Sequence, residues 1–201
     1  GVACAAYGDH TLATRAHAQL RLDITQGVRD AVPIAVVPFG GQAEGGPNDV
    51  AAVIAGDLQL SGRFKPLERR DLVARPTRGE QVRFEDWRLL KSDFLVIGHV
   101  APEADGLAVE FEIFNVQTGQ QLLTKRLVTG ERGLRATAHR IADLIFERLT
   151  GIPGAFSTRI AYVAVDGRPP RQRYRLMVAD ADGYGPRIVT ESSEPIMSPA
   201  W

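Results

Sequence analysis

Few side chains in this chain of 201 residues have the type and spacing that covalent or acid–base chemistry requires. The four histidines are dispersed along the sequence, at His10, His17, His99 and His139. His99 and His139 have no serine, cysteine or second histidine at a spacing typical of a nucleophile with its base or of a zinc site. The Gly-x-Ser-x-Gly sequence of hydrolase nucleophile elbows is also absent. We therefore expect structural or surface histidines, no catalytic residue, no metal site and no cofactor.

Asp180, Asp182 and Gly183 match the beginning of a calcium-binding loop. The later oxygen ligands and the glutamate that closes such a loop are missing from the residues that follow. A turn between two strands is the better interpretation of this segment.

Glu110 and Glu112 have the spacing of two carboxylates on one face of a strand. Paired carboxylates occur in hydrolases, but Lys125 and Arg126 lie on the predicted neighbouring strand. Cross-strand ion pairs are therefore the simpler prediction.

The composition describes an ordinary globular protein. The formal net charge is zero and 44% of the residues are hydrophobic, so charge gives no argument for a nucleic-acid or anionic-membrane partner. The one basic cluster, Arg168–Arg175, is interpreted as a loop between strands. Cys4 is the single cysteine, which excludes an intrachain disulfide. No apolar run has the length of a membrane span.

The strands that must position these side chains follow from the apolar pattern. Ile34–Val37 and Phe94–Ile97 are continuously apolar, which predicts central strands covered on both faces. Leu107–Phe114 and Leu122–Val128 flank Thr118-Gly119 and predict a hairpin.

Three helices are predicted among these strands. One extends from a cap at Asn48 to about Leu60, and a short one covers Phe84–Leu90. The longest ends at Gly151 and has an apolar stripe of Leu134, Ala138, Ile141, Ile145 and Leu149. Helices alternating with strands predict an α/β fold with a mixed sheet from about residue 20 to residue 150.

Beyond residue 158 the pattern contains strands only, at Ile160–Val165, Tyr174–Ala179 and Ile188–Thr190. Three strands and a proline-containing end amount to one blade of a four-stranded repeat. Because a single blade leaves its edges unpaired, we expect the chain to be a piece of a longer protein; alternatively, the blade packs on the α/β domain or on another chain.

Four segments resemble the TolB family of periplasmic β-propeller proteins of the Tol-Pal system. They are Leu22–Val28 (Leu-Asp-Ile-Thr-Gln-Gly-Val), Pro33–Phe39 (Pro-Ile-Ala-Val-Val-Pro-Phe), Thr150–Val163 (Thr-Gly-Ile-Pro-Gly-Ala-Phe-Ser-Thr-Arg-Ile-Ala-Tyr-Val) and Pro195–Trp201 (Pro-Ile-Met-Ser-Pro-Ala-Trp). The resemblance extends from about Gln19 to Trp201. It implies an α/β N-terminal domain, with a mixed sheet flanked by helices, followed by an all-β partial propeller.

The resemblance and the patterns together predict four parts. Residues 1–18 are interpreted as an export-signal remnant or a disordered extension, because Ala16-His-Ala18 has the small-x-small pattern of a signal-peptidase site. Residues 19–150 form the α/β domain, residues 151–157 a linker, and residues 158–201 the first blade of an incomplete propeller.

In function, the resemblance implies a non-catalytic periplasmic scaffold that links TolA to the lipoprotein Pal, for outer-membrane integrity and constriction at cell division. It implies that the propeller binds Pal and that the N-terminal tail binds TolA. In this sequence the tail corresponds to Gln19, Leu20, Arg21, Leu22, Asp23 and Ile24. Their alternating pattern suits strand addition to a partner sheet, and it equally suits the first strand of the domain.

Two other classes of function remain open from the sequence alone. The chain could be a fragment of a propeller-containing peptidase, which a nucleophile elbow beyond Trp201 would reveal. It could also be a stand-alone α/β module that binds a small molecule at the ends of its strands.

Overall fold

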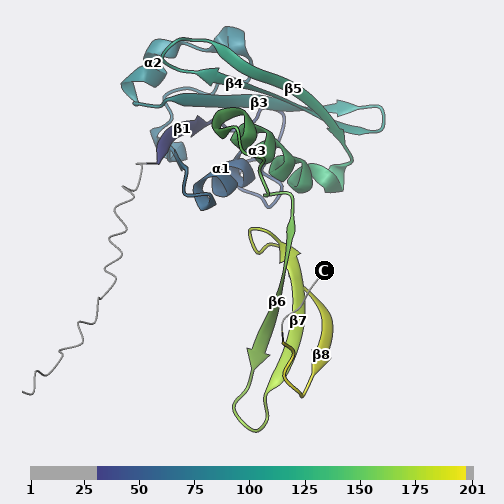
Figure 1. Cartoon of the computed structure of the whole chain (residues 1–201). Helices are drawn as coiled ribbons and strands as arrows, with labels where there is room; N and C mark the ends of the chain where they lie inside the picture. Colours follow the sequence, from purple (N-terminus) through teal and green to yellow (C-terminus); the bar gives the residue numbers. More distant parts are fainter. Residues whose placement is uncertain (1–30, 198–201) are drawn as a thin grey trace, which may run out of the picture.

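A computed structural model describes residues 31–197, which form two separate sheets (Figure 1). The first sheet has the order β2-β1-β3-β4-β5 and carries three α-helices, and the second has the order β6-β7-β8. The strands of the first sheet are β1 (Val32–Val36), β2 (Phe64–Pro66), β3 (Phe94–Glu103), β4 (Gly106–Asn115) and β5 (Gln121–Thr129). The helices are α1 (Val50–Leu60), α2 (Phe84–Leu89) and α3 (Leu134–Thr150). The strands of the second sheet are β6 (Arg159–Asp166), β7 (Arg173–Asp180) and β8 (Arg187–Ser192).

The first sheet is mixed. β1 is parallel to both β2 and β3, whereas β3, β4 and β5 form an antiparallel meander. Helices α1 and α3 pack together on one face (Figure 1), where Ile54, Ile141 and Ile145 are wholly buried. Helix α2 covers part of the other face through the buried indole of Trp87. The predicted mixed sheet flanked by helices is confirmed.

The predicted apolar elements have the structure expected of them. Ala35 and Val37 face one core and Ile34 and Val36 the other, as a strand covered on both faces requires. α3 ends at Gly151, whose φ of 74° is the left-handed conformation that glycine adopts without strain.

Two local predictions need correction. The cap of α1 is Asp49 rather than Asn48, because the Asp49 carboxylate accepts the amide of Ala52 at 3.0 Å. β3 is also longer than its apolar run and continues to Glu103, where a tight turn leads into β4. The pattern missed this first hairpin because Gly98, His99 and Pro102 interrupt the apolar run of β3.

The second sheet is an antiparallel meander that extends away from the helices (Figure 1). The segment from Asp180 to Gly183 makes the turn after β7, as predicted, with the Gly183 amide donating to the Asp180 carbonyl at 2.8 Å. Large apolar side chains on this sheet remain exposed, including those of Val165, Ile188 and Val189. Within residues 31–197, no helix has both the length and the apolar character needed to cross a membrane.

Candidate functional site

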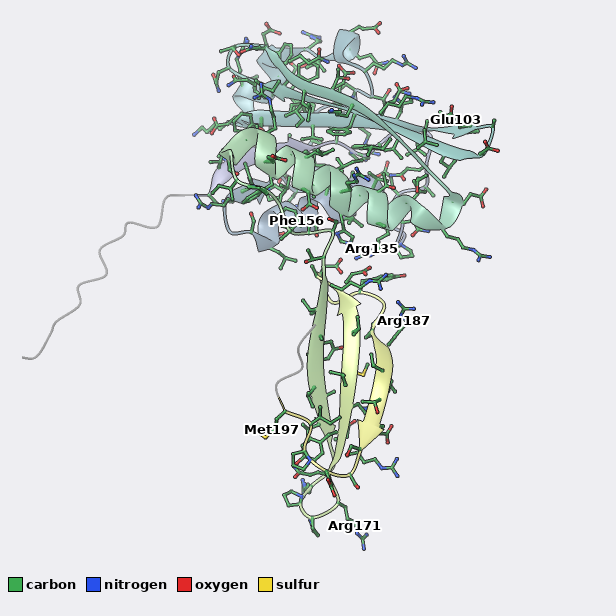
Figure 2. All side chains as sticks on the ribbon, turned by 45° about the vertical axis from the view of Figure 1, so that its right-hand side comes forward. Glu103, Arg135, Phe156, Arg171, Arg187 and Met197 are labelled. Carbon is green, nitrogen blue, oxygen red and sulfur yellow. The ribbon has the colours of Figure 1, made fainter. Side chains whose placement is uncertain are left out.

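The long helix α3 makes contacts through two of its faces. Its apolar stripe, from Leu134 to Leu149, packs on the first sheet and on α1. A second, polar stripe consists of Arg135, His139 and Asp143. These residues are spaced by four, so they lie on neighbouring turns of the same helix face. All three contact the part of the chain that leads into, or belongs to, the second sheet. We call this set of contacts the junction (Figure 2).

His139 lies at the centre of the junction with only 3% of its side chain exposed. Its Nδ1 atom is 2.7 Å from Oδ2 of Asp57 in α1, whose side chain is 2% exposed. Its Nε2 atom faces Asp182, in the turn after β7, across 3.9 Å. Within the described residues Nε2 has no hydrogen-bond partner, so the ring has one bonded nitrogen and one nitrogen directed at the second sheet.

Burial and charge act in opposite directions on the imidazole. Burial alone lowers the pKa of His139, but the hydrogen bond that its Nδ1 donates to Asp57 and the negative charges of Asp57 and Asp182 outweigh it, and the pKa lies above its ordinary value. Burial also raises the pKa of the Asp57 carboxyl, which the His139 hydrogen bond only partly offsets. The two groups therefore hold a shared proton to higher pH than an isolated histidine would.

Arg135 joins α3 directly to the turn between β7 and β8. Its guanidinium forms an ion pair with Asp182, and it lies 3.9 Å from the ring centroid of Tyr184, a cation–π contact. A further oxygen, from Asp180 at the end of β7, is 4.0 Å from its Nε atom. Because the Arg135 side chain is only 15% exposed, these contacts are shielded from solvent.

Asp143 holds the segment that enters the second sheet. Its carboxylate accepts the amides of Phe156 at 2.6 Å and of Ser157 at 3.2 Å. The Phe156 ring packs edge-on against Phe146 of α3, with centroids 5.6 Å apart. The connecting chain is thus fixed to the helix by polar and aromatic contacts before β6 begins.

Asp57, His139 and Asp182 also place one potential metal ligand each within 4.8 Å of one another. However, Nδ1 of His139 is bonded to Asp57, and the Asp182 carboxylate is paired with Arg135. The guanidinium already supplies the positive charge that a cation would bring. The arrangement therefore fits a connection between two parts of the chain better than an ion site.

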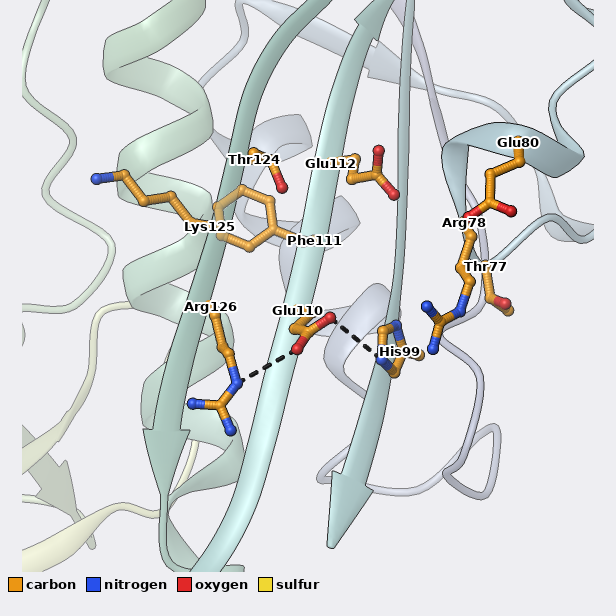
Figure 3. Close-up of a pocket in the computed structure, with 10 residues that line it drawn as sticks. All are labelled: Thr77, Arg78, Glu80, His99, Glu110, Phe111, Glu112, Thr124, Lys125 and Arg126. Carbon is orange, nitrogen blue, oxygen red and sulfur yellow. Dashed lines mark ion pairs between the residues drawn. The ribbon is translucent and has the colours of Figure 1, made fainter. Parts of the chain in front are cut away.

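The Glu110 and Glu112 pair lies at a separate cleft of about 300 Å³ on the face of the first sheet that α2 leaves open (Figure 3). Glu110 lies between His99 of β3, at 3.4 Å, and Arg126 of β5, at 3.3 Å. Glu112 accepts the Gly79 amide and the Gln121 side chain. The carboxylates are thus occupied by ordinary cross-strand and loop contacts.

The predicted role of Lys125 as a cross-strand partner is wrong. Lys125 lies opposite Phe111 in the β4–β5 register, whereas Arg126 lies opposite Glu110. Side chains alternate between the faces of a strand, so the Lys125 amine belongs to the α3 side of the sheet. Only Arg126 pairs with Glu110 as predicted.

The sequence interpretation did not find the junction. It treated His139 as an isolated side chain, because Asp57 is 82 residues away in sequence. One signal was present: polar residues at positions 135, 139 and 143 form a stripe on the helix face away from the apolar one. The predicted tail residues, Gln19 to Ile24, lie outside the described residues, so the structure does not test their role.

Comparison with known proteins gives the same order of parts along the chain. Residues 20–122 match the family model of the TolB amino-terminal domain, and residues 146–201 match that of the TolB beta propeller domain. The Tol-Pal system protein TolB of Methylococcus capsulatus is 46% identical over 185 residues, which cover 92% of this chain and 43% of that protein. The corresponding protein of Nitrosococcus oceani is 47% identical over 186 residues, with the same coverage.

The fold agrees as well. A crystal structure of TolB from Acinetobacter baumannii has a TM-score of 0.74 and 37% sequence identity, covering 85% of this chain and 41% of that one. The all-β part therefore corresponds to the propeller region predicted from the sequence. The chain spans less than half the length of the curated relatives it matches.

Proposed function

The chain belongs to the TolB family, and from that membership we propose that it works as a scaffold of the Tol-Pal system, linking TolA to Pal. The family is periplasmic and non-catalytic, which removes the peptidase alternative. The observation that carries the proposal is the match of both parts, in order, to the two TolB domains. In this role the chain contributes to outer-membrane integrity and to constriction at cell division.

We assign the parts of this scaffold as the sequence suggests. Residues 19–150 are the N-terminal domain, residues 151–157 the linker and residues 158–201 the first blade, preceded by an extension over residues 1–18. The hydrogen bonds from the amides of Phe156 and Ser157 to the Asp143 carboxylate support a short linker that is fixed to α3. The exposed apolar side chains of β6 and β8 support a place beside a neighbouring blade, which would cover them.

TolA is assigned to the N-terminal tail, at Gln19, Leu20, Arg21, Leu22, Asp23 and Ile24. The alternation of Leu20, Leu22 and Ile24 with polar residues suits addition to a sheet edge of the partner. Backbone hydrogen bonds would then supply affinity, and the apolar side chains would select the partner. Pal is assigned to the propeller as a whole, without residues in this chain.

The junction supports communication between the two partner sites. It ties the turn after β7 to α3, which belongs to the N-terminal domain and packs on its sheet. A change at the propeller sheet that moved Asp182 would also change the environment of His139 and Arg135. A conformational change of the propeller would in this way alter contacts of the N-terminal domain.

The test is calorimetric titration of the TolA C-terminal domain into the chain, with and without residues 1–24. We expect binding that disappears when the tail is removed. The triple variant Leu20→Asp, Leu22→Asp and Ile24→Asp should behave like the deletion, whereas Arg21→Ala with Asp23→Ala, which leaves the apolar positions intact, should bind. Binding that survives removal of the tail, or its absence from the intact chain, would refute the assignment.

A further inference from the structure

Strand β5 forms one edge of the first sheet, and within residues 31–197 no strand pairs with its outer side. It extends from Gln121 to Thr129, and Thr124, Lys125, Arg126 and Val128 are exposed. Long uncovered edge strands present a row of free backbone groups to which another strand can bind. The β5 edge is therefore a candidate interaction surface, distinct from the tail and from the propeller.

The register identifies the free backbone groups. The Asn115 amide donates to the Gln120 carbonyl across the β4–β5 turn, so Asn115 and every second residue before it in β4 direct their backbone groups to β5. Their partners in β5 face back toward β4 and are Leu123, Lys125, Leu127 and Thr129. The intervening residues Thr124, Arg126 and Val128 therefore direct their amides and carbonyls outward.

One end of this edge is closed. The Leu122 carbonyl, next to the irregularity in the β4–β5 pairing, accepts a hydrogen bond from Nε of Arg148 at 2.8 Å. This contact confirms that a carbonyl at this end points away from β4. An added strand would thus pair between Thr124 and Val128 and stop at Arg148.

A groove of about 430 Å³ lies beside the edge, between β5 and α3. Leu123 and Leu144 form an apolar floor, and Lys125, Glu147 and Arg148 contribute charged groups. Among the described residues no carboxylate lies within ion-pair distance of the Lys125 amine. On the opposite face Arg126 is already paired with Glu103 and Glu110. The groove side therefore carries two cations, Lys125 and Arg148, against one carboxylate, Glu147, and its net charge is positive.

The charges argue against a second copy of this chain as the occupant. Antiparallel pairing of two β5 edges about Lys125 would set the two Lys125 side chains opposite one another, and pairing about Arg126 would do the same with the two Arg126 side chains. Like charges directly opposite one another destabilise paired strands. A segment with acidic side chains opposite these positions would instead be attracted.

We propose that the β5 edge and its groove bind an extended acidic segment of a partner protein by antiparallel strand addition. The segment places apolar side chains opposite Leu123 and Leu127 and a carboxylate opposite Lys125. Its backbone bonds to the outward groups of Thr124, Arg126 and Val128. The site lies on the N-terminal domain, so it does not require the tail.

The probe is the blocked peptide acetyl-Thr-Val-Leu-Glu-Glu-Thr-Leu-Thr-amide, titrated into the 201-residue chain. Its two glutamates fall opposite Arg126 and Lys125 when its leucines fall opposite Leu127 and Leu123. We expect saturable binding with a dissociation constant below about 1 mM. The same peptide with two lysines in place of the glutamates should bind several times more weakly.

Two readouts separate strand addition from general attraction. Amide hydrogen exchange should slow at Thr124, Arg126 and Val128 when the peptide binds, and change little at Lys125 and Leu127, whose amides already face β4. Lys125→Glu should weaken binding of the glutamate peptide about fivefold and favour the lysine peptide. Lys65→Glu, on the opposite edge strand β2, makes the same charge reversal at an exposed edge position and should leave binding unchanged.

Three outcomes would overturn the proposal. One is the absence of saturable binding, and a second is binding without the alternating protection. The third is protection of the same three amides without peptide. If that protection rose with protein concentration, a second copy would be the occupant; if it did not, the chain's own residues 1–30 would be.

Discussion

His139 in α3 bonds Asp57 in α1 through Nδ1 at 2.7 Å, and its other nitrogen, Nε2, faces Asp182 of the second sheet at 3.9 Å. One imidazole thus lies between a carboxylate of its own domain and a carboxylate of the blade. Its protonation adds attraction on both sides at once. The charge state of a single ring should therefore affect both the packing of α1 on α3 and the attachment of the blade.

The first prediction concerns pH. The pKa of folded His139 is raised, so its contribution to stability is complete below its ordinary value of about 6.5 and is lost as pH rises through the folded pKa. Urea unfolding between about pH 6 and pH 9 should show wild-type stability falling relative to His139→Gln, which cannot titrate. His99→Gln, at a partly exposed strand position, is the control. Equal pH slopes for wild type and His139→Gln would contradict the prediction.

The second prediction concerns Arg135 and Asp182. Arg135→Ala should free the turn after β7 from α3 and leave the first sheet folded, because the apolar stripe of α3 is untouched. Hydrogen exchange should quicken at the turn and in β6 to β8 but not in β3. A double-mutant cycle with Asp182→Ala should give a coupling of about 1–2 kcal/mol, since both side chains are mostly shielded. Arg187→Ala, on exposed β8, should have no such effect, and additive losses at Arg135 and Asp182 would exclude the coupling.

The third prediction concerns the cap of α1. The Asp49 carboxylate accepts the amides of Gly45 and Ala52 and pairs with Arg69 at 2.8 Å. Burial alone would raise the pKa of Asp49, but these partners hold it below its usual value. Asp49→Ala should therefore lower the free energy of unfolding by about 2 kcal/mol in chemical denaturation. Asn48→Ala, at the position favoured by the sequence, should cost much less.

The same carboxylate predicts an acid dependence. Because its folded pKa is lowered, its contribution is present above the ordinary value near 4 and is lost as pH falls through the folded pKa. Asp49→Asn keeps an acceptor for the amides but removes the titration. The stability gap between wild type and this variant should therefore close on acidification. A gap that stayed constant with pH would show that titration of the Asp49 carboxylate does not affect stability.

The fourth prediction compares two glycines. A methyl group at Gly98, in the centre of β3, would overlap the Glu110 carbonyl and the Phe39 ring. Gly98→Ala should cost about 2–3 kcal/mol by overpacking. Gly56 lies within α1 with no atom near its absent side chain, so Gly56→Ala should stabilise the protein by about 0.5–1 kcal/mol. Thermal unfolding that shifts both variants in the same direction would contradict this contrast.

The sequence predicted the elements whose signal is local. Residues close in sequence are enough to predict three of these elements, through their periodicity or their backbone conformation. They are the run Ile34–Val37, the stripe from Leu134 to Leu149 and the helix end at Gly151. Each is as predicted. The turn at Asp180–Gly183 was found for the same reason.

The junction could not be predicted in this way, because its partners are distant in the chain. Asp57, His139 and Asp182 become neighbours only when α1 packs on α3 and the second sheet returns to α3. Asn48 and Asp49 are both good cap residues, and the one that caps α1, Asp49, also accepts a hydrogen bond from Arg69, which lies beyond β2. Contacts that need the assembled fold leave only weak signals in one sequence.

The polar stripe on α3 also limits how this protein can change in length. Along the helix, Arg135 contacts the turn after β7, His139 contacts Asp57 and that turn, and Asp143 contacts the connecting chain. One inserted residue between Arg135 and Asp143 would rotate everything beyond it by about 100° and separate these contacts. An insertion in the glycine-rich loop before α1 would rotate none of them. Length variation among natural sequences should therefore occur in loops such as that one, while the interval between Arg135 and Asp143 stays constant.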